Sequence, residues 1–506
     1  MTKQFSMELA GRTLMVEVGR VAARSKARMA PSGRQRTDFS VGGQNGPSGA
    51  TRKEITMRKS TLLKAAAIAV LPMLALSACG SSSNTNADAN GGEQNVTFWY
   101  SNSGPAVDAI NQLVSEFNDA NKGKIKVEAS YQGSYTDVQQ KFSAAVQAKS
   151  TPSILQMNDT STGYMIDSKM TTPVYKFAEG DSDFDTADLQ PVALKYYSDD
   201  NGLLSLPFAI SQPVTYINNK LAQQAGLDVS NPPTTFAEVV DWANTIHEKT
   251  GAYGFSMNMV DSWILEELSA SHGELIATPD NGRGGKAVTG VNMTSATQLD
   301  MFQKIADMFK DGVALNPGTD SSSMTTAFTS NKVGVVLTSS ASYTSMLPDN
   351  SSKNVTIAQF PHDDATKDAG TPIGGNSLWI VAAEHSEAEQ KATWEFGKYM
   401  MTPHAQAVFA KASGNLFANT KAADEAEGKE ILQDPNVKVF YDQLATNPST
   451  SVSLGARTGA YPSIRKDVMA SFNEVVGGSK DLKTAMQEAQ TQSAKDIATY
   501  NKAAGK

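Results

Sequence analysis

The stretch VTFWYSNSGPAVDAINQLVSEFNDANKGKIKVEASY, residues 96–131, decides the fold class of this chain. Residues 96–100 are apolar or β-favouring, which predicts a strand, and Pro105 is typical of the first turn of a helix. Apolar side chains then recur at helical spacing, at Val107, Ile110, Leu113, Val114 and Phe117. Residues 124–131 alternate in polarity and predict a second strand. Strand, helix and strand in this order form the unit of parallel sheets.

The same alternation continues outward from this stretch. We expect a helix over 136–149 and a short strand over 153–157, which together predict a doubly wound sheet. Capping boxes predict two later helix starts, at Thr235 with Glu238 and at Ser386 with Glu389. Further strands are expected over 254–258, 333–339, 355–360 and 377–381. The C-terminal region is expected to be helical, with Pro462 at a helix start, so the chain is predicted to be an α/β protein.

The single cysteine, Cys79, lies at the end of an apolar run. Basic residues precede the run, and residues 65–76 are too few to span a bilayer, as in a secretory signal peptide. Small residues before the thiol resemble the bacterial lipobox, in which the cysteine is acylated and becomes the mature N-terminus. We predict a signal peptide over 57–78, lipidation at Cys79 and a flexible tether over 79–95. The alternative is a buried structural cysteine, but nothing amphipathic continues the run.

Residues 1–56 do not fit this arrangement, because a signal peptide belongs at the start of a chain. We expect that Met57 is the true start and that residues 1–56 are either not part of the native protein or disordered. This piece carries ten Lys and Arg against four Asp and Glu. Its other interpretation, a basic arm that binds nucleic acid, is the weaker one.

Charge limits the partners of the exported part. The whole chain has 44 Lys and Arg and 52 Asp and Glu; 13 of these basic and four of these acidic residues precede Cys79, which leaves a net charge of −17 from Cys79 onward. Such a charge argues against nucleic acid and an anionic membrane surface as partners, but not against a small anionic ligand. The 428 residues from Cys79 contain no cysteine pair and are enough to bury a core without disulfides.

Several short motifs occur in a specific order along the chain: YQGSY at 131–135, PSILQ at 152–156, YYS at 196–198, LLSLPF at 203–208, YINNK at 216–220, GGNSLW at 374–379 and PSIR at 462–465. With these motifs the chain resembles the solute-binding subunits of ABC importers, family 1. Within that family it is most similar to the receptors for sn-glycerol 3-phosphate and glycerophosphodiesters. The resemblance covers residues 96 to about 476.

The resemblance implies a two-lobed, type II periplasmic-binding-protein-like fold, in which each lobe is a mostly parallel sheet flanked by helices and the C-terminal region is helical. The implied lobes are 96–207 plus 360–414 and 208–359 plus 415–506. A small-molecule ligand is held between the lobes, which close by a hinge motion. The implied partners are ABC permease subunits and, through the lipid anchor, the outer face of the cytoplasmic membrane. No cofactor is implied.

The resemblance also implies ligand-binding residues: Tyr135, Asp159, Ser211, Ser340, Gly375 and Arg465. A guanidinium suits a phosphate by its permanent charge and fork geometry, and a carboxylate accepts hydrogen bonds from glycerol hydroxyls. Serine hydroxyls suit phosphate oxygens, and glycine lets the backbone approach the ligand. From the residues alone, a core tyrosine, a helix-capping aspartate, ordinary turn serines and a surface arginine stay open as alternatives. Arg457 lies near Arg465 in sequence and is expected to add charge.

Two further positions bear on the ligand. Trp263 is expected to line the cleft and to stack on a choline group or a sugar face, with a core tryptophan as the alternative. Asn415 stands where the family has a cleft tyrosine, so one phenol is lost. An oligosaccharide receptor is therefore kept as the second interpretation.

Other patterns lack the spacing of known sites. The acidic loop 181–188 has Thr186 where a calcium loop needs Gly, and His362 with its two aspartates is interpreted as a solvated turn. The glycine-rich loop 282–285 lacks the Lys and Ser/Thr of a P-loop and is interpreted as a surface loop. No GxSxG or HExxH occurs in the sequence. We expect a binding protein without metal and not an enzyme.

Overall fold

The computed structural model describes residues 3–9, 12–18 and 92–506. The chain divides into two units, Met1–Asn86 and Ala87–Lys506. In the first unit, β1 (Lys3–Leu9) and β2 (Arg12–Val18) form an antiparallel pair with Lys3 opposite Val18. The sequence of these two strands alternates in polarity with a period of two, and the expectation that residues 1–56 are not part of the native protein or are disordered stays a prediction. The predicted signal peptide and Cys79 lie outside the described residues.

The second unit begins with a five-stranded sheet in the order β4-β3-β5-β15-β8. Its strands are β3 (Gln94–Tyr100), β4 (Ile125–Tyr131), β5 (Ile154–Asn158), β8 (Leu206–Ser211) and β15 (Gly374–Ile380). The strand–helix–strand prediction for 96–131 is confirmed, since α1 (Pro105–Ala120) joins the parallel strands β3 and β4. Helix α2 (Tyr135–Ala148) then leads to β5, and only β15 runs against its neighbours.

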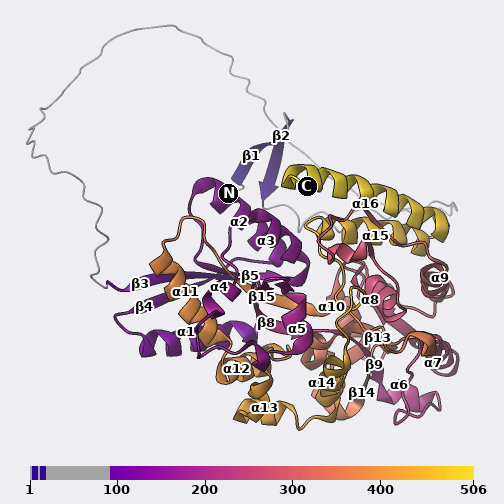
Figure 1. Cartoon of the computed structure of the whole chain (residues 1–506). Helices are drawn as coiled ribbons and strands as arrows, with labels where there is room; N and C mark the ends of the chain where they lie inside the picture. The colour runs from indigo at the N-terminus through magenta and orange to yellow at the C-terminus, as the bar shows by residue number, and fades with distance from the viewer. Residues whose placement is uncertain (1–2, 10–11, 19–91) are drawn as a thin grey trace, which may run out of the picture. The chain divides into compact units, whose positions relative to one another are not determined.

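A four-stranded sheet follows in the order β10-β13-β9-β14. Its strands are β9 (Pro213–Asn218), β10 (Tyr253–Met257), β13 (Val333–Ser339) and β14 (Val355–Ala358). Here β9 is antiparallel to both of its neighbours, whereas β10 and β13 are parallel. Each sheet is thus mostly parallel with one reversed strand, and the predicted two-lobed α/β fold is confirmed. The two sheets and their helices form neighbouring groups in Figure 1.

Helices cover both sheets. The first sheet is accompanied by α3 (Thr162–Ser168), α4 (Tyr175–Ala178), α5 (Pro191–Tyr196), α11 (Glu387–Met400) and α12 (Pro403–Ser413). The second is accompanied by α6 (Asn219–Gln224), α7 (Phe236–Thr250), α8 (Trp263–Ser271), α9 (Ala296–Lys310) and α10 (Ser321–Thr329). The C-terminal helices are α13 (Ala426–Ile431), α14 (Pro435–Thr446), α15 (Tyr461–Val476) and α16 (Leu482–Ala504). Both predicted capping boxes are present, at the starts of α7 and α11.

The two sheets meet where the chain passes directly from one to the other. Strand β8 ends at Ser211, which lies opposite Gly374, the first residue of β15. Strand β9 begins at Pro213, which lies opposite Ser339, the last residue of β13. The ends of four strands are therefore brought together around residues 211–213, and this junction positions the candidate site. In the described part of the chain, no helix is both long and apolar enough to cross a bilayer.

Candidate functional site

A cavity of about 170 Å³, here called the strand-end cavity, lies at the junction of the two sheets. It is lined by Asp159, Ser211, Asn258, Asp261, Trp263, Ser339, Gly374, Gly375 and Arg465. Asp159 directly follows β5, Asn258 follows β10, and Ser211 and Ser339 end β8 and β13. Ligands of open α/β sheets bind outside the carboxyl ends of the strands, so this is the position expected for a binding site. Five residues predicted from the sequence meet here: Asp159, Ser211, Trp263, Gly375 and Arg465.

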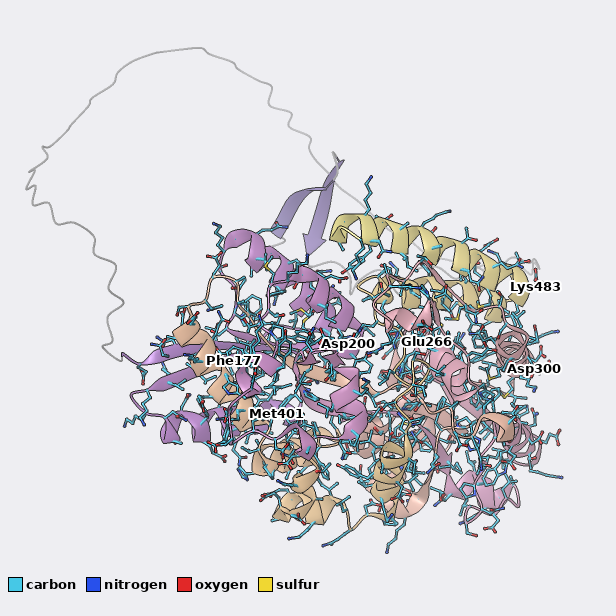
Figure 2. All side chains as sticks on the ribbon, in the orientation of Figure 1. Phe177, Asp200, Glu266, Asp300, Met401 and Lys483 are labelled. Atoms are coloured by element: carbon cyan, nitrogen blue, oxygen red, sulfur yellow. The ribbon has the colours of Figure 1, made fainter. Side chains whose placement is uncertain are left out.

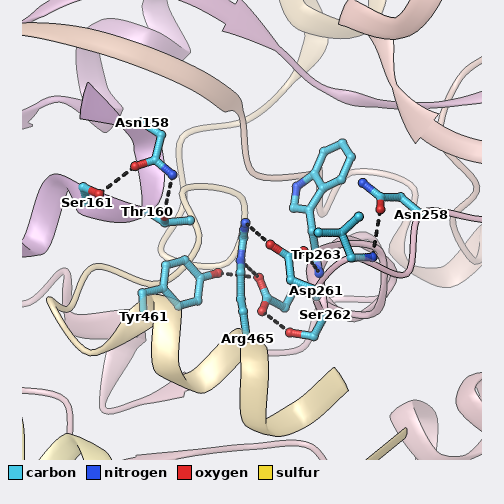
Figure 3. Close-up of polar contacts among 11 residues, drawn as sticks. Asn158, Thr160, Ser161, Asn258, Asp261, Ser262, Trp263, Tyr461 and Arg465 are labelled. Carbon is cyan, nitrogen blue, oxygen red and sulfur yellow. Dashed lines mark hydrogen bonds and ion pairs between the residues drawn. The ribbon is translucent and has the colours of Figure 1, made fainter. Parts of the chain in front are cut away.

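Arg465, in the second turn of α15, is held by a buried carboxylate. Its Nε donates to Glu266 Oε2 at 2.9 Å, and the Tyr461 hydroxyl donates to the same oxygen at 2.8 Å (Figure 3). The Ser262 hydroxyl donates to the other Glu266 oxygen at 2.6 Å. The guanidinium also lies 4.8 Å from the centre of the Tyr461 ring. These contacts fix the plane of the guanidinium and leave its Nη edge on the cavity side, where Asp261 Oδ2 is 3.8 Å from Nη1.

Carboxyl groups outnumber cations around this cavity. Burial acts against the charged form of Arg465, but Glu266, Tyr461, Asp261 and Asp159 outweigh it, so the pKa of the guanidinium lies above its ordinary value. Burial raises the pKa of Asp159 to about 6, although Arg465 partly offsets it. Arg465 is the only cationic side chain among the described residues that line the cavity. A ligand here meets one guanidinium whose charge is already shared with carboxylates.

Glu267 stands beside Glu266 on α8 but has a different environment. Its side chain is buried, and neither carboxyl oxygen has a hydrogen-bond partner among the described residues. Burial raises the pKa of Glu267 well above its ordinary value, and the nearby Arg465 only partly offsets this effect. Glu266 is the ion-pair partner of Arg465, whereas Glu267 has no ion pair among the described residues.

Tyr135 lies behind the cavity rim and does not line it. Its hydroxyl accepts a hydrogen bond from Asn376 Nδ2 at 2.9 Å, and Asn376 follows Gly375 on β15. Burial raises the pKa of this phenol to about 12. Tyr135 is therefore linked to the cavity through the strand that carries Gly375 and through its electrostatic interaction with Asp159.

The structure places Ser340 and Asn415 elsewhere than the sequence suggested. Ser340 is fully buried, and its hydroxyl accepts from the backbone N–H of Gln212 at 3.2 Å, so Ser339 lines the cavity in its place. Strand β13 ends at Ser339, as predicted, and Ser340 is the first residue after it. Asn415 lines a separate cavity of about 210 Å³ with Tyr343 and Phe440.

The cavity also contains residues that the sequence analysis missed. Asn258, Asp261 and Ser339 line it, and Glu266 and Tyr461 orient Arg465 from behind. The pair Glu266–Glu267 in the apolar helix WILEELSAS was the available signal, because adjacent carboxylates on a buried helix need a reason to be there. In the described residues, no group of three or more His, Cys, Asp or Glu is arranged to hold a metal ion.

Comparisons with known proteins show which family the chain belongs to. Residues 112–439 match a family model described as bacterial extracellular solute-binding protein. The sn-glycerol-3-phosphate-binding periplasmic protein UgpB of Rhizobium meliloti is 28% identical over 402 residues, which cover 78% of this chain and 91% of that protein.

Solved structures share the fold. UgpB from Mycobacterium tuberculosis, in complex with glycerophosphocholine, matches with a TM-score of 0.65 at 20% identity, over 80% of this chain and 98% of that one. The sugar-binding protein MalE from Xanthomonas citri matches with a TM-score of 0.67 at 19% identity, over 80% and 98%. The chain therefore belongs to the bacterial extracellular solute-binding proteins, as a UgpB-like solute-binding protein of an ABC importer.

Proposed function

We propose that the strand-end cavity captures a glycerophosphodiester, or sn-glycerol 3-phosphate, and that the chain delivers it to the permease subunits of its importer. The observation that carries this proposal is Arg465, a guanidinium held in one orientation at the carboxyl ends of the strands. The similarity to UgpB proteins, whose printed names give sn-glycerol 3-phosphate as ligand, supports the same ligand class.

Each wall of the cavity suits one part of such a ligand. The Nη edge of Arg465 faces the phosphate, and the Ser211 and Ser339 hydroxyls are close enough to add donors. Asp159 accepts hydrogen bonds from the glycerol hydroxyls. Gly375 has a φ of 118°, and a Cβ there would lie 2.0 Å from the Ala209 carbonyl oxygen, so only glycine allows the backbone to take this path beside the ligand.

The charges favour a diester over a monoester. A phosphate monoester carries roughly −1.5 to −2 at pH 7, whereas a diester carries only one negative charge. Arg465 already shares its charge with Glu266 and Asp261, so a dianion meets uncompensated repulsion in this cavity. A cationic head group on the diester would in addition face Asp261 and the Trp263 ring, which attracts quaternary ammonium groups. We therefore propose a zwitterionic diester such as glycerophosphocholine as the preferred ligand.

An oligosaccharide is the second candidate. The observation in its favour is the excess of carboxyl groups over cations beside Trp263, because carboxylates accept hydrogen bonds from sugar hydroxyls and indole rings stack on sugar faces. An oligosaccharide is uncharged, however, and would leave the Arg465 guanidinium without an anionic partner on the ligand.

Attachment to the cell surface is part of the proposal. Lipidation of Cys79 after removal of residues 57–78 would keep the receptor near its permease, and residues 79–95 would leave it free to move. The lobe boundaries at residues 207, 359 and 414 are proposed with it.

A thermal-shift screen tests the ligand directly. Glycerophosphocholine should raise the melting temperature most, glycerol 3-phosphate less, and maltooligosaccharides not at all. Stabilisation by the sugars alone would contradict the proposal that the ligand is a glycerol phosphate or its diester, and would favour an oligosaccharide. Lys483→Gln is a matched control, because this exposed residue on α16, labelled in Figure 2, does not line the strand-end cavity.

A further inference from the structure

A larger cavity than the strand-end cavity lies elsewhere, and its cations have no role in the proposed function. This seam cavity, of about 630 Å³, is lined from one side by segments within residues 163–204 and from the other by segments within 282–288 and 454–458. The first segments belong with the five-stranded sheet and the second with the four-stranded sheet and α15. Tyr196 separates the seam cavity from the strand-end cavity, since its hydroxyl donates to the Asp159 carbonyl oxygen and its ring lies 4.4 Å from Arg283.

Two arginines of the seam cavity bond to carbonyl oxygens instead of carboxylates. Arg283 donates to the carbonyl oxygens of Gly455, Tyr196 and Leu454, and Arg457 donates to that of Ser198 at 3.0 Å. Neither guanidinium has a carboxylate at ion-pairing distance in the described part of the chain. A guanidinium has five N–H donors, so most of those on Arg457 remain available to a ligand. Burial lowers the pKa of Arg283 to about 10 and lowers that of Arg457, as expected for cations without a counter-ion.

The glycine-rich loop 282–285 contributes donors to the same cavity. The backbone N–H groups of Gly285 and Lys286, which both line the cavity, have no acceptor among the described residues. The loop is fixed to the second arginine, because Arg457 N–H donates to the Asn281 carbonyl oxygen at 2.7 Å. Gly282, at φ 69°, is needed there, since a Cβ would lie 2.5 Å from the Arg457 carbonyl oxygen. Free N–H groups beside fixed cations form an anion-binding concavity.

The charge balance of the seam cavity is positive in a strongly acidic protein. Lys195 and Lys286 line it with the two arginines, and Asp167, Asp199 and Asp200 oppose them. Asp167 is already paired with Lys506 at 2.6 Å and accepts from the Tyr500 hydroxyl. Lys506 also lines the cavity, so five cations and three aspartates do, and apart from the Lys506–Asp167 pair four cations face two aspartates. This is the reverse of the balance in the strand-end cavity.

We propose that the seam cavity binds a small multivalent oxyanion, of the class of inorganic phosphate or a phosphate monoester, as a second site independent of the cleft ligand. The anion bridges Arg283, Arg457 and the 282–286 loop to Lys195 on the opposite wall. Because the two walls belong to different sheets, the bound anion stabilises their contact and so favours the closed arrangement of the lobes.

Calorimetric titration of the full chain with inorganic phosphate, at constant ionic strength and pH 7, tests this site. Wild type should bind phosphate, Arg457→Gln should bind about tenfold more weakly, and the exposed Lys286→Gln about threefold more weakly. Lys483→Gln, which removes one exposed charge on α16, should not change the affinity. Lys286→Gln keeps the test valid even if Arg457→Gln fails to fold, because its side chain is exposed.

The variant Arg465→Gln distinguishes phosphate binding at the seam cavity from ligand binding at the strand-end cavity. It should leave phosphate binding at the seam cavity unchanged while it weakens binding of glycerophosphocholine by about a hundredfold. The inference is overturned if wild type does not bind phosphate, if Lys286→Gln binds as well as wild type, or if Arg465→Gln abolishes phosphate binding.

Discussion

The strand-end and seam cavities hold arginines in opposite ways. Arg465 is paired with the buried carboxylate of Glu266, whereas Arg283 and Arg457 bond only to carbonyl oxygens among the described residues. A carboxylate fixes orientation but reduces the charge left for a ligand; carbonyl oxygens fix orientation and leave the full charge. The first arrangement suits a weakly charged or zwitterionic ligand, and the second suits a compact anion.

The largest effect is expected when the counter-ion of Arg465 is removed. Glu266→Gln leaves a buried guanidinium without its main partner, so the free energy of unfolding should fall by about 3 kcal/mol. Urea denaturation followed by circular dichroism measures this loss. Glu267→Gln is the matched control one residue away and should change stability by less than about 1 kcal/mol, because Glu267 has no ion pair or hydrogen-bond partner to lose among the described residues. Equal losses in the two variants would contradict the assignment of Glu266 as the counter-ion.

Replacing a glycine by alanine should also cost more stability in the strand-end cavity than in the seam cavity. Gly375→Ala places a Cβ against the Ala209 carbonyl oxygen at a positive φ, and should cost about 3 kcal/mol. Gly285→Ala, at φ 74° in the seam loop, has nothing within 4 Å of its Cβ and should cost only about 1 kcal/mol. The same denaturation measurement compares them, and a larger loss for Gly285→Ala would show that the loop is packed more tightly than the cavity.

A smaller difference is expected in the response to pH. The folded pKa of Asp159, about 6, lies above its ordinary value of 3.8, so the native state binds more protons between these values. The stability that Asp159 contributes is therefore present below about pH 4 and is lost as the pH rises to about 6. Asp159→Asn should flatten this fall in the free energy of unfolding between pH 4 and 6. Arg457→Gln should leave the slope unchanged, since a guanidinium does not titrate there.

The fold was largely predictable because its signals are local. The helical spacing after Pro105, the alternation over 124–131 and the capping boxes at Thr235 and Ser386 depend on neighbouring residues only, and the structure confirms them. Strands β1 and β2 were not predicted, because their period-two pattern is short and precedes the expected start.

The residues of the site were predictable only where they lie at the end of a predicted strand. Asp159 and Ser211 follow or end buried strands, so their place at the junction comes with the sheet. Ser339 and Ser340 are adjacent serines, and which one faces the cavity depends on the residue at which β13 ends. The seam cavity joins loop 282–285 to segments far away in sequence, and nothing local distinguishes that loop from a surface turn.

The central claim is that Arg465 binds the phosphate of a glycerophosphodiester while Arg457 does not. Calorimetric titration with glycerophosphocholine tests it most directly, on wild type and on the two Arg→Gln variants. We predict that Arg465→Gln weakens binding by about a hundredfold, from the loss of a charge-assisted bidentate contact, and that Arg457→Gln binds within about twofold of wild type. Normal binding by Arg465→Gln, or an equal loss in both variants, would contradict the account.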